Sequence, residues 1–121
     1  MKTIPYYWDK TVTVFTPEYD DQSGKAVWHK SVYENAYYAH TSASSFKSDD
    51  MWRENRVACR IPQKNVNVIP GSTVVFLGEV EENIPDGRSA NELKKQHPEH
   101  FTVKSVTHND CPLPHTHLTG A

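Results

Sequence analysis

The chain has 121 residues and a formal net charge of −2, with 13 Lys and Arg against 15 Asp and Glu. We expect one domain over residues 1–121, because two domains would have about 60 residues each, where burial on folding becomes marginal. The balanced charge lacks the basic excess that is typical of proteins gripping duplex DNA. No apolar run approaches the roughly 20 residues that cross a membrane, and residues 1–8 lack the apolar core of a signal peptide. We therefore expect synthesis in the cytoplasm and no membrane partner.

Two alternating segments open the chain. Residues 10–16 and 25–33 are rich in Val, Thr and aromatic residues and have the alternation of strands. The stretch between them contains Asp, Ser and Gly, which favour turns, so the pair predicts a β-hairpin. Residues 36–40 predict a continuation of it or a third short strand.

A polar stretch follows the predicted hairpin. Residues 41–50 contain four Ser, one Thr and two Asp. This composition predicts an exposed polar loop over about residues 41–55. Loops of this length are unusual in compact domains and are often functional, although a solvated tip without a role has the same composition.

Two further strands are predicted in the middle of the chain. Residues 56–61 alternate cleanly, with Val57, Cys59 and Ile61 on one face. In this position Cys59 is expected to be a small buried hydrophobe. Residues 72–77 form a short apolar run bounded by glycines, which predicts a strand buried on both faces.

One short helix is predicted, over about residues 89–97. Residues 89–92 match a capping box, and Pro98 disfavours a helical residue before it. About two turns cannot stand alone in water. We therefore expect an insertion that docks on a sheet.

Two more strands are predicted at the end of the chain, and they allow the fold class to be predicted. Residues 101–107 predict a strand in which a bulge near Ser105 would return Val106 to the core. Residues 113–118, with their proline, fit a final edge strand. Together these elements predict a mainly β fold: a small antiparallel β-barrel or sandwich of about five to seven short strands with one short inserted helix.

Histidine is concentrated toward the end of the chain, where five of the seven lie between positions 97 and 117. His115 and His117 fall on one face of a predicted strand, at a spacing that metal sites use, and His108 and Cys111 are near them in the sequence. Against a zinc site, the chain has no CxxC pair and no acidic residue placed to orient the rings. We expect no metal; a small metal-binding protein with these four ligands is the alternative from another class.

The sequence contains no catalytic constellation. It has neither a Gly-x-Ser-x-Gly nucleophile motif nor a phosphate-binding glycine loop. Cys111 lies between Asp110 and Pro112 in a predicted loop, without a sign of the electropositive surroundings that activate a thiol. We expect neither enzymatic activity nor a cofactor.

The aromatic residues allow two other interpretations. Single-stranded nucleic acid stacks on aromatic platforms, but it also needs a positive groove, and the basic residues here are scattered. Tyr6, Tyr7 and Trp8 precede the first strand. There they would anchor an assembly interface or pack back over their own barrel.

The pattern as a whole resembles a known family. The matching parts are the residue 11–15 strand with Trp28, the 57–62 strand, the strand between Gly71 and Gly78, the 101–106 strand, and residues 113–115 with Gly120. In these features the chain resembles small virion proteins of tailed phages and prophages of Gram-positive bacteria, whose genes lie near the capsid and connector genes. The resemblance implies a head–tail connector component similar to head-closure (stopper) proteins. Those are small β-barrels that form a ring around the DNA channel, with a long loop that projects into it.

The resemblance also implies a location, partners and channel residues. It implies a virion protein made in the cytoplasm of a bacterial host, a homo-oligomeric ring in the virion, and an isolated chain that can be a monomer. The implied partners are an adaptor and a tail-completion protein, with non-specific proximity to packaged DNA. A minor capsid or tail-completion role stays open as an alternative. On this chain the channel loop would carry Ser45, Lys47, Asp49, Asp50 and Arg53.

Overall fold

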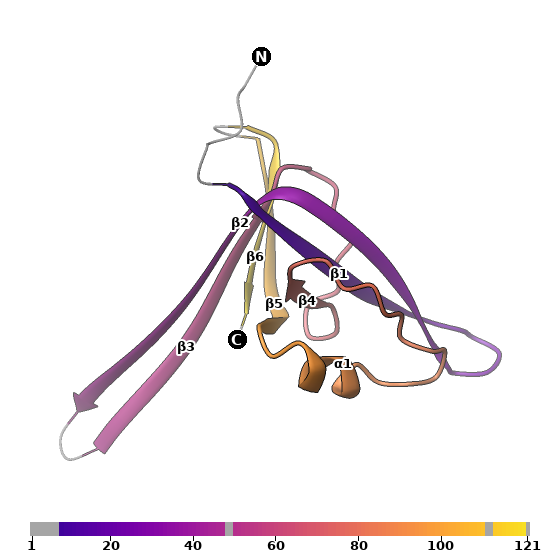
Figure 1. The fold of residues 1–121 in the computed structure, drawn as a ribbon, viewed down its shortest axis with the longest axis horizontal. Coiled ribbons are helices and arrows are strands. Elements are labelled where there is room, and N and C mark those ends of the chain that lie inside the picture. Colours follow the sequence, from indigo (N-terminus) through magenta and orange to yellow (C-terminus); the bar gives the residue numbers. More distant parts are fainter. Residues whose placement is uncertain (1–7, 48–49, 111–112, 121) are drawn as a thin grey trace.

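The computed structural model describes residues 8–47, 50–110 and 113–120, with their side chains except in residues 41–55. Six antiparallel strands form a closed barrel in the order β1-β2-β3-β6-β5-β4 (Figure 1). The elements are β1 (Lys10–Tyr19), β2 (Ala26–Lys47), β3 (Asp50–Ile61), β4 (Val74–Leu77), α1 (Asn91–Gln96), β5 (His100–Asn109) and β6 (His115–Gly120). The expected mainly β fold with one short helix is confirmed, in its barrel form. One strand is not short, because β2 has 22 residues.

Alternate residues of the strands fill the barrel interior. Val12 and Val14 of β1 point inward, as do Val57, Cys59 and Ile61 of β3. The remaining buried members of this cluster are Ala36, Val66, Val75, Phe101, Val103 and Leu118. Because successive strand residues face opposite sides, one apolar face of each strand closes the core. The predicted inward face of β3 and the burial of its cysteine are confirmed.

A second apolar cluster lies outside the barrel, over β1 and β4. Phe15 and Phe76 meet there edge to face, with ring centroids 5.6 Å apart. The loop after β4 and helix α1 cover them with Val80, Ile84, Ala90 and Leu93. The predicted short helix docked on a sheet is confirmed, although Ala90 rather than a capping side chain is its N-cap. Among the described residues no helix has the length and apolarity to traverse a bilayer.

A β-bulge bends β5. Its register with β6 shifts between Val103 and Ser105, as the sequence predicts, and Val106 then packs against the interior cluster. Beside the bulge, a Cβ atom on Gly120 would lie 2.1 Å from the Thr102 carbonyl oxygen. Non-bonded atoms cannot approach so closely, so only glycine fits where β5 and β6 close the barrel.

The predicted polar loop over residues 41–55 is wrong. β2 continues to Lys47, β3 begins at Asp50, and the strands pair without a break from Thr41↔Arg56 to Lys47↔Asp50. We call residues 41–47 and 50–56 the arm, which projects from the barrel as a two-stranded ribbon (Figure 1, lower left). Amino-acid composition does not reveal this strand pairing, because backbone N–H and C=O groups make the hydrogen bonds between the strands and polar side chains do not prevent them.

Candidate functional site

The arm leaves two strand edges without a neighbour. β1 pairs with β2 only as far as Ala36, and β6 pairs with β3 only from Val57. Along the arm, therefore, neither outer edge pairs with a described strand. Its seven residues per strand span roughly 23 Å at about 3.3 Å per residue. Because a two-stranded ribbon is marginally stable by itself in water, the arm is a candidate to be stabilised by another molecule.

Four of the five predicted channel residues lie on the arm. Ser45 and Lys47 belong to β2, and Asp50 and Arg53 belong to β3. The register pairs Lys47 with Asp50 at the far end of the ribbon. Asp49 lies outside the described residues. Paired strands therefore carry these residues, and their contact with a channel stays a prediction.

Contacts on one face fix the base of the arm to the barrel. His40 Nδ1 lies 3.1 and 3.2 Å from the two carboxylate oxygens of Glu99, just before β5. Tyr38 packs on Phe101, with ring centroids 5.9 Å apart. Burial, and then the nearby Glu99 carboxylate, raise the pKa of the Tyr38 hydroxyl, which stays protonated. The first residues of the arm are thus held in one direction relative to the barrel.

The opposite, outward face at the arm base carries a cross-strand row of polar residues. The register places Tyr37 beside Arg60, Arg60 beside His117, and His117 beside Thr107. The Arg60 guanidinium carbon lies 5.3 Å from the centre of the Tyr37 ring, in cation–π geometry. Burial, then Arg60 and His115, lower the pKa of His117, which is therefore neutral at pH 7. We call Tyr37, Arg60, His117 and Thr107 the Arg60 row.

The structure does not bring together the three described ligands of the alternative metal site, His108, His115 and His117. His117 and His115 share a face, but His108 lies on the other face, where Nδ1 contacts the Lys64 carbonyl oxygen and lies 3.2 Å from Thr116 Oγ1. His115 is buried, and its Nδ1 donates to a backbone oxygen at 2.8 Å. Cys111 lies outside the described residues. Within the described part of the chain, no group of three or more His, Cys, Asp or Glu side chains is placed to hold a metal ion.

Trp8 is not an exposed assembly anchor. Its side chain is 3% exposed, and its ring meets the His115 ring edge-on, with centroids 5.5 Å apart. The indole therefore packs back on its own barrel, which the sequence allowed as the alternative, because a large apolar ring gains more from burial than from exposure. Tyr6 and Tyr7 lie outside the described residues.

An acidic segment covers the outer side of β1 and β4. We give this name to residues 79–86, which contain Glu79, Glu81, Glu82 and Asp86 and no Lys or Arg. All four carboxylates are exposed. This segment was not among the sites predicted from the sequence, although its run of acidic residues is visible there. Between it and α1 lies an open hollow of about 580 Å³.

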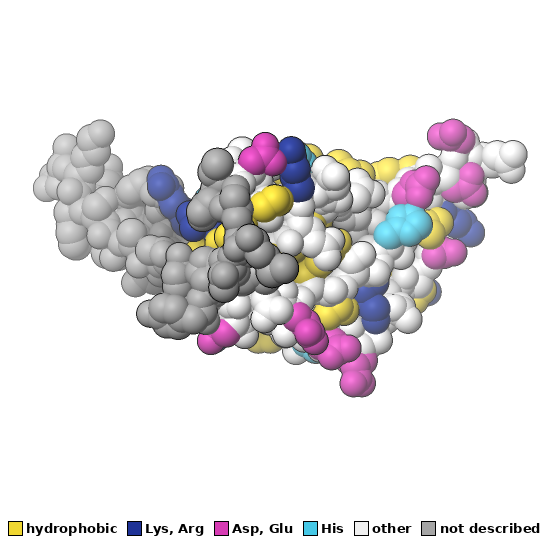
Figure 2. Space-filling model, turned by 90° about the horizontal axis from the view of Figure 1, so that it is seen from above, with side chains coloured by type: hydrophobic (Ala, Val, Ile, Leu, Met, Phe, Trp, Pro, Cys, Tyr) yellow, Lys and Arg dark blue, Asp and Glu magenta, His cyan; other side chains and the backbone are white. Residues whose placement is uncertain are grey.

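The described surface has no continuous basic groove on the face drawn in Figure 2. Lys and Arg side chains are scattered there, and acidic side chains gather at the end where the β1–β2 hairpin turns. A single-strand nucleic-acid platform would need its aromatic residues beside a positive track. On this face the arrangement does not favour that interpretation.

Comparisons with known proteins give a family without an assigned activity. No curated protein matches the chain. No solved structure matches it either. One family model, described as a family of unknown function (DUF6751), matches residues 7–121. This match covers the barrel, the arm, the acidic segment and the Arg60 row, so the chain belongs to the DUF6751 family.

Proposed function

We propose that this chain is a non-enzymatic virion protein of a tailed phage or prophage: a head-closure-type component of the head–tail connector that forms a ring around the DNA channel. The observation that carries the proposal is a closed barrel from which one strand pair extends as a free-standing arm. The family resemblance implies the same two parts, a small barrel and a long projecting segment. In this chain the projecting segment is a paired ribbon instead of a loop.

A ring would supply what the arm lacks. Each arm has two unpaired edges within the described structure, and symmetry-related arms around a channel would provide neighbours for them. Residues 41–56 contain three basic and three acidic residues. A segment without net charge suits a channel through which DNA must slide, because dense basic contacts would bind the phosphates tightly.

Deleting the gene from the phage or prophage that carries it tests this function. We expect induced cells to produce heads that have lost DNA together with unattached tails, because the closed connector both retains DNA and receives the tail. Electron microscopy of the particles measures both classes. Complementation with the full chain should restore complete virions. Complete, infectious virions from the deletion strain would contradict the proposal.

An arm-shortened chain sharpens this experiment. In this variant Ser42 is joined to Asn55 through an Asn-Gly turn, which suits a two-residue hairpin and follows the pairing of Ser42 with Asn55. We expect it to fold and to fail in complementation. Heads that keep their DNA but lack tails would favour a tail-completion role instead, and malformed heads would favour a minor capsid role.

A further inference from the structure

The acidic segment and the Arg60 row lie on opposite sides of the barrel. The acidic segment packs against β1 and β4 through Val80 and Ile84. The centre of the Arg60 row lies on β3 and β6, which are the farthest strands from β1 and β4 in the closed order. Two surfaces of different charge on opposite sides of one body can join copies head to tail, and such contacts close into rings when the rotation between copies permits.

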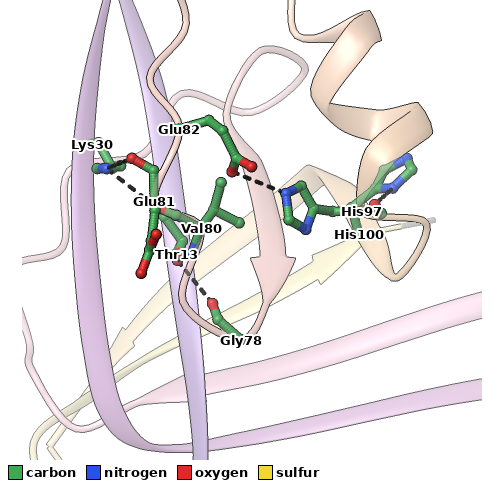
Figure 3. A network of polar contacts seen from close by, with 8 residues as sticks. All are labelled: Thr13, Lys30, Gly78, Val80, Glu81, Glu82, His97 and His100. Atoms are coloured by element: carbon green, nitrogen blue, oxygen red, sulfur yellow. Dashed lines mark hydrogen bonds and ion pairs between the residues drawn. The ribbon is translucent and has the colours of Figure 1, made fainter.

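The acidic segment is held in a fixed conformation. Thr13 Oγ1 donates to the Gly78 carbonyl oxygen at 2.8 Å and accepts the Val80 amide at 2.9 Å. Lys30 Nζ donates to the carbonyl oxygens of Val80 and Glu81, at 3.2 and 3.1 Å (Figure 3). Because these hydrogen bonds are made to backbone atoms of the segment, they fix its conformation and leave the carboxylate of Glu81 unengaged.

The side chains of the acidic segment differ in their availability. Glu82 is engaged, because its carboxylate lies 3.1 Å from His97 Nε2. The Glu81 carboxylate points away from the Lys30 ammonium (Figure 3). Among the described residues it has no hydrogen-bond or ion-pair partner, and it is exposed. Glu81 therefore presents an exposed carboxylate that, unlike Glu82, is not engaged within the described structure.

Arg60 offers the complementary group. Its guanidinium is oriented over the Tyr37 ring. Its Nε atom is buried without a hydrogen-bond partner in the described structure, and no described carboxylate forms an ion pair with this side chain. The residues of the next cross-strand row, Ala58 and Thr119, are small. The Arg60 side chain as a whole is only partly buried, these small neighbours leave room beside it, and a carboxylate is the group that matches the planar donors of a guanidinium.

We propose that the acidic segment of one copy docks on the Arg60 row of the next copy, with the Glu81 carboxylate accepting hydrogen bonds from the Arg60 guanidinium. The occupant of the Arg60 row is thus a second copy of this chain. The contact is heterologous, so every copy uses both surfaces and a closed ring leaves neither one vacant. This inference deepens the proposed function, on which it rests, by naming the contact that builds the ring.

Cross-linking between two different single-cysteine chains tests the contact. One chain carries Glu79→Cys, the other carries Thr107→Cys, and both carry Cys111→Ser; Cys59 is buried and stays protected. With a short bismaleimide at high protein concentration, we expect a cross-linked dimer from the mixture and none from either chain alone. Cross-linking of the Thr107→Cys chain with itself would indicate a two-fold contact and overturn the proposal. Absence of any cross-link in the mixture would also overturn it.

Charge reversal identifies the pair. Arg60→Glu in the Thr107→Cys chain should lower the cross-linked fraction by roughly tenfold, since it replaces attraction by repulsion. Glu81→Arg in the other chain should restore it. Lys25→Glu in the Thr107→Cys chain, on the exposed hairpin tip, is the matched control and should change nothing, because this chain contributes its Arg60 row and not its acidic segment to the cross-link. Arg60→Gln covers the case in which Arg60→Glu does not fold, as judged by circular dichroism. No rescue by Glu81→Arg would exclude the named pair.

The two proposals fail separately. If the mixture does not cross-link while gene deletion still yields open heads and free tails, the head-to-tail contact is wrong and the connector function stands. If the cross-link forms with its charge rescue while the deletion strain makes complete virions, the contact is right and the connector function is wrong.

Discussion

The barrel and the arm share two strands, β2 and β3, which have different neighbours in the two parts of the molecule. Within the barrel, β2 pairs first with β1 and then, from Tyr37, with β3, while the end of β3 pairs with both β2 and β6, and inward residues of both strands join a buried core. Along the arm they pair only with each other among the described strands. The difference indicates that the barrel supplies the stability and sets the register, and that the arm inherits its strand pairing from the barrel. Stability and assembly can therefore be changed separately, which the following variants test.

The largest effect is expected from the barrel interior. Phe101→Ala should lower the free energy of unfolding by about 3–5 kcal/mol, because Phe101 is fully buried and packs on Tyr38 at the base of the arm. Urea unfolding measures the change. Val32→Ala, at an exposed position of β2, is the control and should stay within about 0.5 kcal/mol. A small effect at Phe101 would contradict the view that the closed core dominates stability.

Closure at the β5–β6 bulge is expected to be the next most sensitive feature. Gly120→Ala places a methyl group 2.1 Å from a backbone carbonyl oxygen and 2.6 Å from the Phe101 ring. The backbone must move, at a cost of about 1–3 kcal/mol. The change in melting temperature reports it. A variant as stable as the parent would mean that the barrel is not closed tightly at this point.

The next largest loss of stability is expected from the Thr13 hydroxyl, which holds the acidic segment. Thr13 is fully buried, and Thr13→Val leaves the Gly78 carbonyl oxygen and the Val80 amide without their partner. We expect a loss of about 1–2 kcal/mol and faster hydrogen exchange at the Val80 amide. Thr107→Val, at an exposed strand position, should leave both quantities unchanged. Equal exchange at Val80 in Thr13→Val and in the parent would show that the hydroxyl does not hold the segment.

Alternation predicted the strands of the barrel from the sequence, although not whether they form a barrel or a sandwich, and composition gave the wrong prediction for the arm. Val57, Cys59 and Ile61 identify an inward face directly, because the core demands an apolar side chain at every second position. Alternation of apolar side chains does not predict the pairing of residues 41–55. Their pairing follows from the register of the preceding strand and not from side-chain burial. Pairing that is inherited from a neighbouring structure leaves little trace in local composition.

The candidate surfaces were harder to predict than the fold. Tyr37, Arg60 and His117 are far apart in the sequence and meet only through the register of three strands. The sequence left the position of Trp8 open for a related reason, since its burial depends on His115 at the other end of the chain. Side chains that act together across strands become visible only when the strand order is known.

Acidification should weaken the barrel through His117. The pKa of His117 is lowered in the folded state by burial, Arg60 and His115, so the unfolded chain binds the proton more readily. The stability that this gives is present above the unfolded pKa of about 6.5 and is lost as the pH falls below it. We expect His117→Gln to lose less stability than the parent between pH 7 and pH 5, as measured by urea midpoints. Between pH 7 and pH 8 the difference between the two proteins should stay constant.

The smallest change in stability is expected from the arm itself. Joining Ser42 to Asn55 through Asn-Gly should alter the free energy of unfolding by less than about 0.5 kcal/mol, since an isolated two-stranded ribbon adds little to a closed barrel. Urea unfolding of the purified variant measures this. A matched excision of residues 37–42 and 55–60 removes the buried Val57 and Cys59 and should prevent folding. If shortening the arm cost as much as the Phe101 substitution, the arm would belong to the folding unit. Only near-parental stability combined with failed complementation assigns the arm to assembly, because loss of fold could not then explain the loss of virions.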